Sequence, residues 1–187
     1  RDYWVVFGVI PDLIEAFLFS ILGISWQVHI FHSSLFNGLI SVATFFVLQK
    51  IGLNLLISFI YSILFSILAY TLSGTPFIDH HATFFSLLGI YSIFLGIKTK
   101  KNYFWTIAII FFVLSFFSKQ VPVAYIGIFI TPLIIYYCFI NKNFKPIYYS
   151  VVSFLIIIII ILLTLKINSI NIGDFLVQYI FYPPNIG

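Results

Sequence analysis

Residues 147–165 read IYYSVVSFLIIIIIILLTL, and no side chain in this run carries a charge. A helix needs about 20 consecutive apolar residues to cross the hydrocarbon core of a bilayer, so this run is long enough to span. The chain as a whole is 62% hydrophobic and 7% charged, whereas about 25% of the residues of an ordinary soluble domain are charged. The sequence therefore predicts an integral membrane protein.

Five more apolar runs bring the number of predicted spans to about six. The six are residues 26–49, 53–72, 82–97, 103–118, 123–140 and 147–165. Because every backbone polar group needs an internal partner in lipid, and because the runs lack the alternating pattern of barrel strands, we expect an all-α, polytopic transmembrane helix bundle.

Residues 11–22, PDLIEAFLFSIL, form an apolar run that is too short to cross the bilayer. Asp12 and Glu15 lie in its first turn, which favours a helix lying along the outer interface. The predicted organisation has three parts: residues 1–25, in a first extracytoplasmic loop with this interfacial helix; residues 26–165, the six-span bundle; and residues 166–187, the start of a later extracytoplasmic loop.

The distribution of basic residues predicts the orientation, because cytoplasmic loops carry an excess of lysine and arginine. One set of loops holds six lysines and the other set three basic residues. The first set is Lys50, Lys98, Lys100, Lys101, Lys142 and Lys145; the second is Arg1, Lys119 and Lys166. With the first set inside, every acidic residue and every histidine falls on the outer side. We therefore expect any acid–base or ligand chemistry at the extracytoplasmic face.

The stretch SGTPFIDHHATFF, residues 73–85, leads from the second predicted span into the third and places an acid beside two histidines. Asp79 could orient a substrate hydroxyl, act as a base, or hold a divalent metal together with an imidazole. It could also simply stabilise the start of a helix through free backbone N–H groups and the helix dipole. His80 and His81 are adjacent and would point in different directions on a helix, which argues against a shared two-histidine metal site.

Two further groups of polar residues lie near predicted span ends. Lys119 follows the fourth span on the outer side, where a cation requires a partner; it could bind a lipid phosphate or extend to the headgroups. His29 and His32 are three residues apart and share one helix face. For these two histidines, packing or a hydrogen bond to a neighbouring helix is the favoured interpretation over metal ligation.

The first 25 residues, RDYWVVFGVIPDLIEAFLFSILGIS, and the span carrying HSSLFNGLISVATFFVLQKIG suggest a family by their order. Together with Asp79 in GTPFIDHHATFF and Lys119 in LSFFSKQVP, they resemble the polyprenyl-phosphate-sugar-dependent membrane glycosyltransferases of the GT-C type. The similarity is to the protein mannosyltransferase and lipid A aminoarabinose transferase group, and it extends over about residues 1–125. An Asp-Glu pair of that family would precede residue 1, so we interpret the chain as an internal fragment.

The resemblance implies transfer of a sugar, with inversion, from a polyprenyl-phosphate donor to a protein, lipid or glycan acceptor at the extracytoplasmic face. It implies catalytic roles for Asp2 and Asp79, and we expect substrate binding by Lys119, His80, His81 and Tyr3, although the two histidines are not general residues of that family. The location would be the bacterial inner membrane, with membrane lipid but no nucleic acid as a partner. No cofactor is certain, and a requirement for a divalent metal stays open.

A membrane transporter or flippase for a lipid-linked or polar solute is the alternative function. Such proteins also place charged groups inside the membrane, but usually near its midplane, in broken helices. Here the predicted spans are apolar in their middles and the acids lie in the outer loops, which favours chemistry at the surface. A non-catalytic assembly subunit is a third interpretation that the sequence leaves open.

Overall fold

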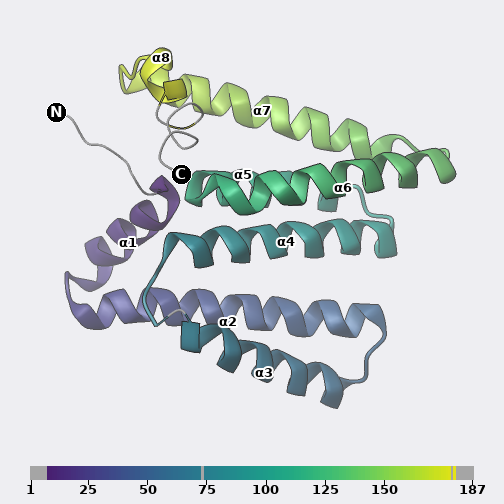
Figure 1. The fold of residues 1–187 in the computed structure, drawn as a ribbon, viewed down its shortest axis with the longest axis horizontal. Coiled ribbons are helices and arrows are strands. Elements are labelled where there is room, and N and C mark those ends of the chain that lie inside the picture. Colours follow the sequence, from purple (N-terminus) through teal and green to yellow (C-terminus); the bar gives the residue numbers. More distant parts are fainter. Residues whose placement is uncertain (1–7, 73, 178, 180–187) are drawn as a thin grey trace.

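A computed structural model describes residues 8–72, 74–177 and 179, and within these residues the chain is helical, without strands. The helices are α1 (Val9–Leu22), α2 (Trp26–Ile51), α3 (Leu55–Leu72), α4 (Ile78–Thr99), α5 (Tyr103–Ser118), α6 (Gln120–Ile140), α7 (Lys145–Ile167) and α8 (Ile172–Leu176). From α2 to α7 successive helices run in opposite directions, and α1 crosses one end of this bundle obliquely (Figure 1).

Local sequence explains several helix ends. The Ser25 side chain accepts a hydrogen bond from Val28 N–H at the start of α2, and Gly52 ends that helix with a φ of 114°, a conformation that favours glycine. Pro146 lies in the first turn of α7, where its missing N–H leaves no hydrogen bond unmade. A single extended residue, Lys119, separates α5 from α6.

Four of the described helices are long and apolar enough to cross a membrane: α2, α4, α6 and α7. The 16 residues of α5 span about 24 Å, less than the roughly 30 Å hydrocarbon core, and the apolar part described for α3 is also short. The prediction of an all-α fold is therefore confirmed for the described residues, and these four helices are compatible with a membrane protein. The finer prediction, about six spans, stays a prediction.

Two loops are shorter than expected from the sequence. We expected residues 73–81 to form a turn, but α4 begins at Ile78, so Asp79, His80 and His81 lie in its first turn. Likewise, α6 begins at Gln120, inside the turn expected at residues 119–122. Polar side chains at a helix start are read from sequence as loop, although the helix N-terminus accommodates them well.

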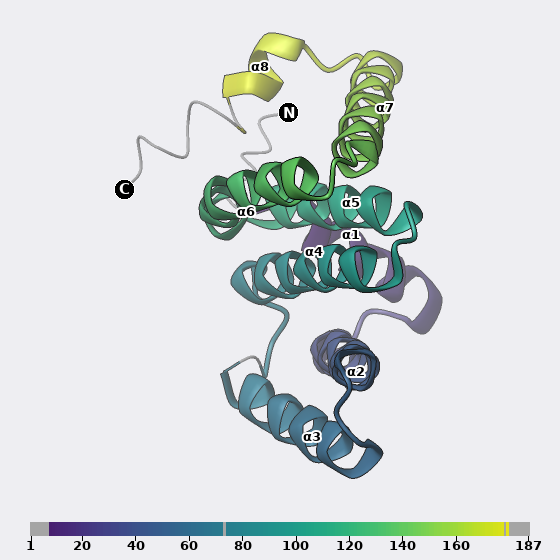
Figure 2. The same ribbon diagram turned by 90° about the vertical axis from the view of Figure 1, so that its right-hand side faces the viewer.

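The tightest packing joins α4 and α5, which share the largest interface, and α2 packs against α4 and α3. A buried cluster of Ile93, Trp105 and Ala108 forms the apolar core. Gly96 lets the Trp105 ring lie against α4: a β-carbon on Gly96 would lie 3.2 Å from that ring. Viewed along the bundle, α6 and α7 lie on different sides of α5 (Figure 2), and they contact each other less than either contacts α5.

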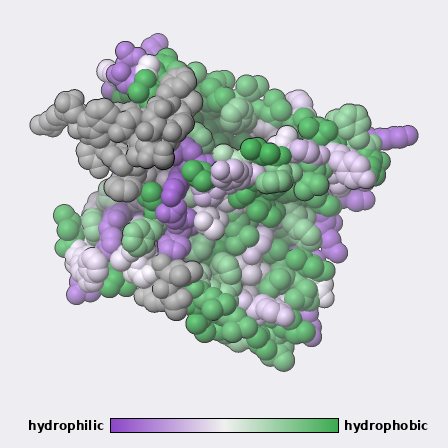
Figure 3. Space-filling view, viewed as in Figure 1, coloured by the Kyte–Doolittle hydropathy of each residue, from purple (hydrophilic) through white to green (hydrophobic). Residues whose placement is uncertain are grey.

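Hydrophilic residues gather toward the two ends of the bundle, and hydrophobic ones cover much of the face between them (Figure 3). The loops α2–α3, α4–α5 and α6–α7 contain or adjoin the six lysines of the predicted inner side, so these lysines share one end. Asp12, Glu15, Asp79, Asp174 and all four histidines lie toward the opposite end. We call this opposite end the acidic end.

Candidate functional site

The acidic end is where α2, α4 and α6 begin and where α5 and α7 finish. Because successive helices alternate in direction, residues distant in sequence meet there. Helix α1 lies across this end and contacts both α2 and α5. Gly8, just before α1, touches α5 so closely that a β-carbon on it would lie 1.7 Å from the Ser118 carbonyl oxygen. Toward α2, Glu15 Oε1 lies 2.5 Å from His29 Nδ1.

Asp79 and Lys119 form an ion pair, with Lys119 Nζ donating to Asp79 Oδ1 at 2.5 Å. The two side chains are 59% and 35% exposed, respectively, so the pair is open to a ligand. The sequence predicted that Lys119 requires a partner, and Asp79 is that partner. Exposed pairs of this kind contribute only about 0–1 kcal/mol to stability, and exchange of the partner would cost little.

The helix-start interpretation of Asp79 also has support. Asp79 lies in the first turn of α4, where a carboxylate favours the positive end of the helix dipole, and Phe77 at the N-cap provides no side-chain hydrogen bond. The dipole and the contact with Lys119 therefore act on the same carboxylate. The Asp79 side chain is mostly exposed, so a ligand can reach it.

His80 and His81 differ sharply in environment, as expected for neighbours on a helix. His81 is 1% exposed; its Nδ1 lies 3.0 Å from the Phe77 carbonyl oxygen and its Nε2 lies 3.0 Å from His32 Nε2. His80 is partly exposed and packs beside the rings of Phe77 and Phe84. Of the two, His80 is the one that an incoming ligand could meet without repacking.

The favoured interpretation of His29 and His32 as packing or hydrogen-bonding residues is confirmed. His29 contacts Glu15 of α1 and stacks on Trp26, with 4.9 Å between ring centroids. His32 is fully buried against His81 of α4. Their three-residue spacing was the only sequence signal of these contacts, and it did not identify Glu15 or His81 as the partners.

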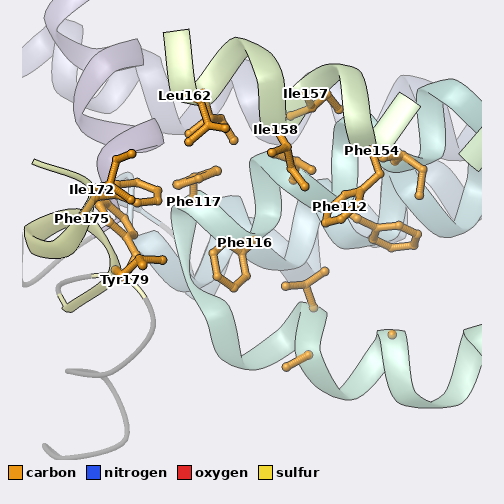
Figure 4. Close-up of a pocket in the computed structure, with 17 residues that line it drawn as sticks. Phe112, Phe116, Phe117, Phe154, Ile157, Ile158, Leu162, Ile172, Phe175 and Tyr179 are labelled. Atoms are coloured by element: carbon orange, nitrogen blue, oxygen red, sulfur yellow. The ribbon is translucent and has the colours of Figure 1, made fainter. Parts of the chain in front are cut away.

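An apolar pocket of about 610 Å³ opens beside the acidic end, between α5, α6, α7 and α8. Phe112, Phe116 and Phe117 of α5 face Phe154, Ile158 and Leu162 of α7 across it (Figure 4). Ile172, Phe175 and Tyr179 close the end nearest α8. Sequence reasoning missed this pocket, because apolar runs do not indicate which faces of two helices stand apart.

The pocket is connected to the acidic end through Tyr179. The Gln120 side chain, next to Lys119, donates a hydrogen bond to the Tyr179 carbonyl oxygen at 3.4 Å. Burial, and secondarily the charge of Asp12, raise the pKa of the Tyr179 hydroxyl. Burial and then the charge of Glu15 raise the pKa of Asp12 itself. The charge of Asp12 on α1 thus acts on Tyr179 at the mouth of the pocket.

The remaining predicted site residues, Asp2 and Tyr3, lie outside the described residues, so their roles in catalysis and substrate binding stay predictions. Within the part of the chain that the structure describes, no group of three or more His, Cys, Asp or Glu side chains is placed to hold a metal ion. Comparison with known proteins identifies no relative: no family model, curated protein or solved structure matches this chain.

Proposed function

We propose that the chain belongs to a membrane glycosyltransferase that transfers a sugar from a polyprenyl-phosphate donor to an acceptor at the extracytoplasmic face. The observation that supports this best is the position of the Asp79–Lys119 pair. It is an exposed acid–base pair close in sequence and space to the mouth of an apolar pocket. A lipid-linked sugar phosphate needs both features, a polar site for its headgroup and an apolar channel for its chain.

The pocket has dimensions suited to part of one lipid chain. Its α5 lining runs from Ile109 to Phe117, and at 1.5 Å per residue this stretch measures about 12 Å along the helix. The first isoprene units of a polyprenyl chain would lie there, and the rest would extend into the bilayer. The donor phosphate would then be near Lys119, which follows Phe117 by two residues.

In the proposed reaction, Lys119 leaves Asp79 to pair with the donor phosphate, and this exchange frees the Asp79 carboxylate. The carboxylate accepts the proton of the acceptor hydroxyl as its oxygen attacks the anomeric carbon. The bond between that carbon and the phosphate oxygen breaks, and polyprenyl phosphate leaves with its electron pair. Attack from the opposite side inverts the anomeric centre. His80, partly exposed beside Asp79, contacts the sugar.

The proposal can be tested with the full chain in lipid nanodiscs, using polyprenyl phosphate as the probe. Lys119→Gln should weaken its binding about 10- to 100-fold, since a charge-assisted hydrogen bond contributes about 1.5–3 kcal/mol. Lys98→Gln is the matched control, because Lys98 lies in the last turn of α4, at the other end of the bundle. Equal binding by wild type and Lys119→Gln would contradict the proposal.

Activity is the second readout, measured as transfer from polyprenyl-phosphate sugars to acceptors in membranes that contain the full-length enzyme, since we expect the fragment to be inactive alone. Asp79→Asn should abolish transfer and leave binding of polyprenyl phosphate intact, because the amide cannot accept the hydroxyl proton. Retention of full transfer by Asp79→Asn, with a lower melting temperature, would restrict Asp79 to a role in stabilising the helix start.

A transporter or flippase is the second candidate, and one observation favours it. Polar side chains are buried well inside α2: Asn37 donates to the Ser66 carbonyl oxygen of α3, and Thr44 bonds Tyr91 of α4. Such groups can mark a solute path, but hydrogen bonds between membrane helices also stabilise packing. Asn37→Leu separates the two: it would block flux in a liposome assay if the path is real, and would only lower stability otherwise.

A further inference from the structure

The buried histidines of α2 and α4 form a polar site that the proposed reaction does not use. His32 is 0% and His81 1% exposed, and their Nε2 atoms lie 3.0 Å apart. Aromatic rings surround them: the Phe36 ring centroid lies 4.5 Å from that of His81 and 5.4 Å from that of His32. A hydrogen bond in such surroundings is strong when made and costly when lost.

The contacts determine where the protons lie in the neutral pair. A carbonyl oxygen can only accept, so His81 Nδ1 must carry the proton that it donates to Phe77. Neutral His81 then has a bare Nε2, which accepts, and His32 must donate from its own Nε2. His32 Nδ1 is left as a bare acceptor, and it is buried without a partner among the described residues.

A further proton cannot be added to the neutral pair without leaving a buried N–H unpaired or breaking the bond between the two rings. To keep the bond between the two Nε2 atoms, a cationic pair must carry N–H groups on both Nδ1 atoms, whichever ring holds the charge. The N–H on His32 Nδ1 would then be buried with no acceptor, which is unfavourable. If both Nε2 atoms are protonated instead, the two N–H groups point at each other and the bond is lost.

We propose that His32 and His81 form a proton-binding site that joins α2 to α4 while both rings are neutral and releases this contact when the pair gains a proton. The other ionisable groups at this end include Asp12 and Glu15 of α1, His29 of α2, Asp79 and His80 of α4, Lys119, and Asp174 of α8. Glu15 and Asp79 already pair with His29 and Lys119, so neither carboxylate is a free acceptor for the new N–H.

The site has a consequence for the neighbouring surface. Asp79 precedes His81 by two residues in the first turn of α4. A movement of this turn away from α2 would therefore also move the Asp79 carboxylate relative to Lys119. The histidine pair thus makes the geometry of the acidic end depend on pH, whichever reaction takes place there.

The proton positions can be read directly by NMR of the full chain in nanodiscs, with ¹⁵N-labelled histidine. At about pH 8, above the ordinary imidazole pKa of about 6.5, His81 should carry its proton on Nδ1 and His32 on Nε2. At about pH 5, the coupling between the two Nε2 atoms should disappear. The opposite tautomers at the higher pH, or an intact bond at the lower one, would overturn the proposal.

A melting experiment isolates the contribution of the pair. Wild type should lose at least about 2–4 °C in Tm on acidification. His32→Gln should lose less, because its amide can donate to His81 Nε2 or turn to accept from it. His80→Gln is the control and should behave as wild type. An unchanged acid response in His32→Gln would contradict the proposal; if that variant does not fold, the wild-type tautomers decide.

Discussion

The half of the bundle that contains α2 and α4 is buried further than the half that contains α6 and α7, although α6 and α7 are the more apolar helices. In the most apolar window of each helix, 39% of the α2 residues and 44% of the α4 residues are buried, against 6% in α6 and 11% in α7. The first half is joined by small and polar residues: Ser115 Oγ bonds both Ser86 Oγ and the Ala82 carbonyl oxygen at 2.7 Å.

The difference has a physical reason. In lipid, apolar side chains gain little by moving from the bilayer to another helix, so association depends on close packing and interhelical hydrogen bonds. Glycine and serine provide both in the α2–α4–α5 half. Large aliphatic and aromatic residues predominate in α6 and α7, where Ser153 of α7 donates one hydrogen bond to Thr106 of α5, and there the helices leave a pocket. Hydrophobicity thus predicts insertion in the membrane, but small and polar residues determine which helices pack tightly.

The largest difference between the halves should come from removing one aromatic side chain from each. Trp105→Ala empties the buried core beside Gly96 and should cost about 3–5 kcal/mol. Phe129→Ala removes a ring that is 71% exposed on α6 and should change stability by no more than about 0.5 kcal/mol. Unfolding in detergent or mixed micelles measures both. Equal losses would show that α6 is packed as tightly as α5.

Disturbing the contact between the start of α1 and the end of α5 should give the next largest loss of stability. Gly8→Ala places a methyl group against the Ser118 carbonyl oxygen and should cost about 1–3 kcal/mol by displacing the start of α1. Gly38→Ala in α2 meets open space, and its effect should be neutral or stabilising. Protease sensitivity of α1, together with Tm, distinguishes the two variants. A stable Gly8→Ala with protected α1 would argue against this contact.

The exposed ion pair should contribute less to stability. Asp79→Asn removes the attraction to Lys119 and should lower the free energy of unfolding by about 0–1 kcal/mol, since both side chains are accessible to solvent. Thermal unfolding at low and high salt measures it. A larger, salt-independent loss of unfolding free energy would show that the pair is a structural contact between α4 and α5 rather than part of an open site.

The smallest effect should come from Asp12, on the exposed side of α1. Burial and Glu15 raise the pKa of Asp12, so the folded state binds a proton more readily than the unfolded state, and stability rises as pH falls toward this pKa. At neutral pH, Asp12→Asn should therefore raise Tm slightly, and the gain should vanish in acid, where the carboxyl is protonated in both states. A lower Tm for Asp12→Asn at neutral pH would contradict this assignment.

The sequence predicted more of the fold than of the site. Uncharged runs such as residues 147–165 indicated membrane helices because a charge in hydrocarbon is costly wherever it lies in the chain. The short run at residues 11–22 likewise indicated a helix that is not a span, and α1 occupies nearly that range. The helix starts at Ile78 and Gln120 were missed, since polar residues at a helix N-terminus resemble a loop in sequence.

The sequence by itself predicted helices apolar enough for a membrane and the gathering of the described acids and histidines at one end, because both depend on the order of residues along one chain. Only the tertiary structure decided that Asp79 pairs with Lys119, that Glu15 meets His29 and that His32 meets His81. Partners on different helices depend on the rotation of each helix about its axis. That rotation is set by the close packing of glycines and serines between helices, which a hydrophobic pattern does not encode.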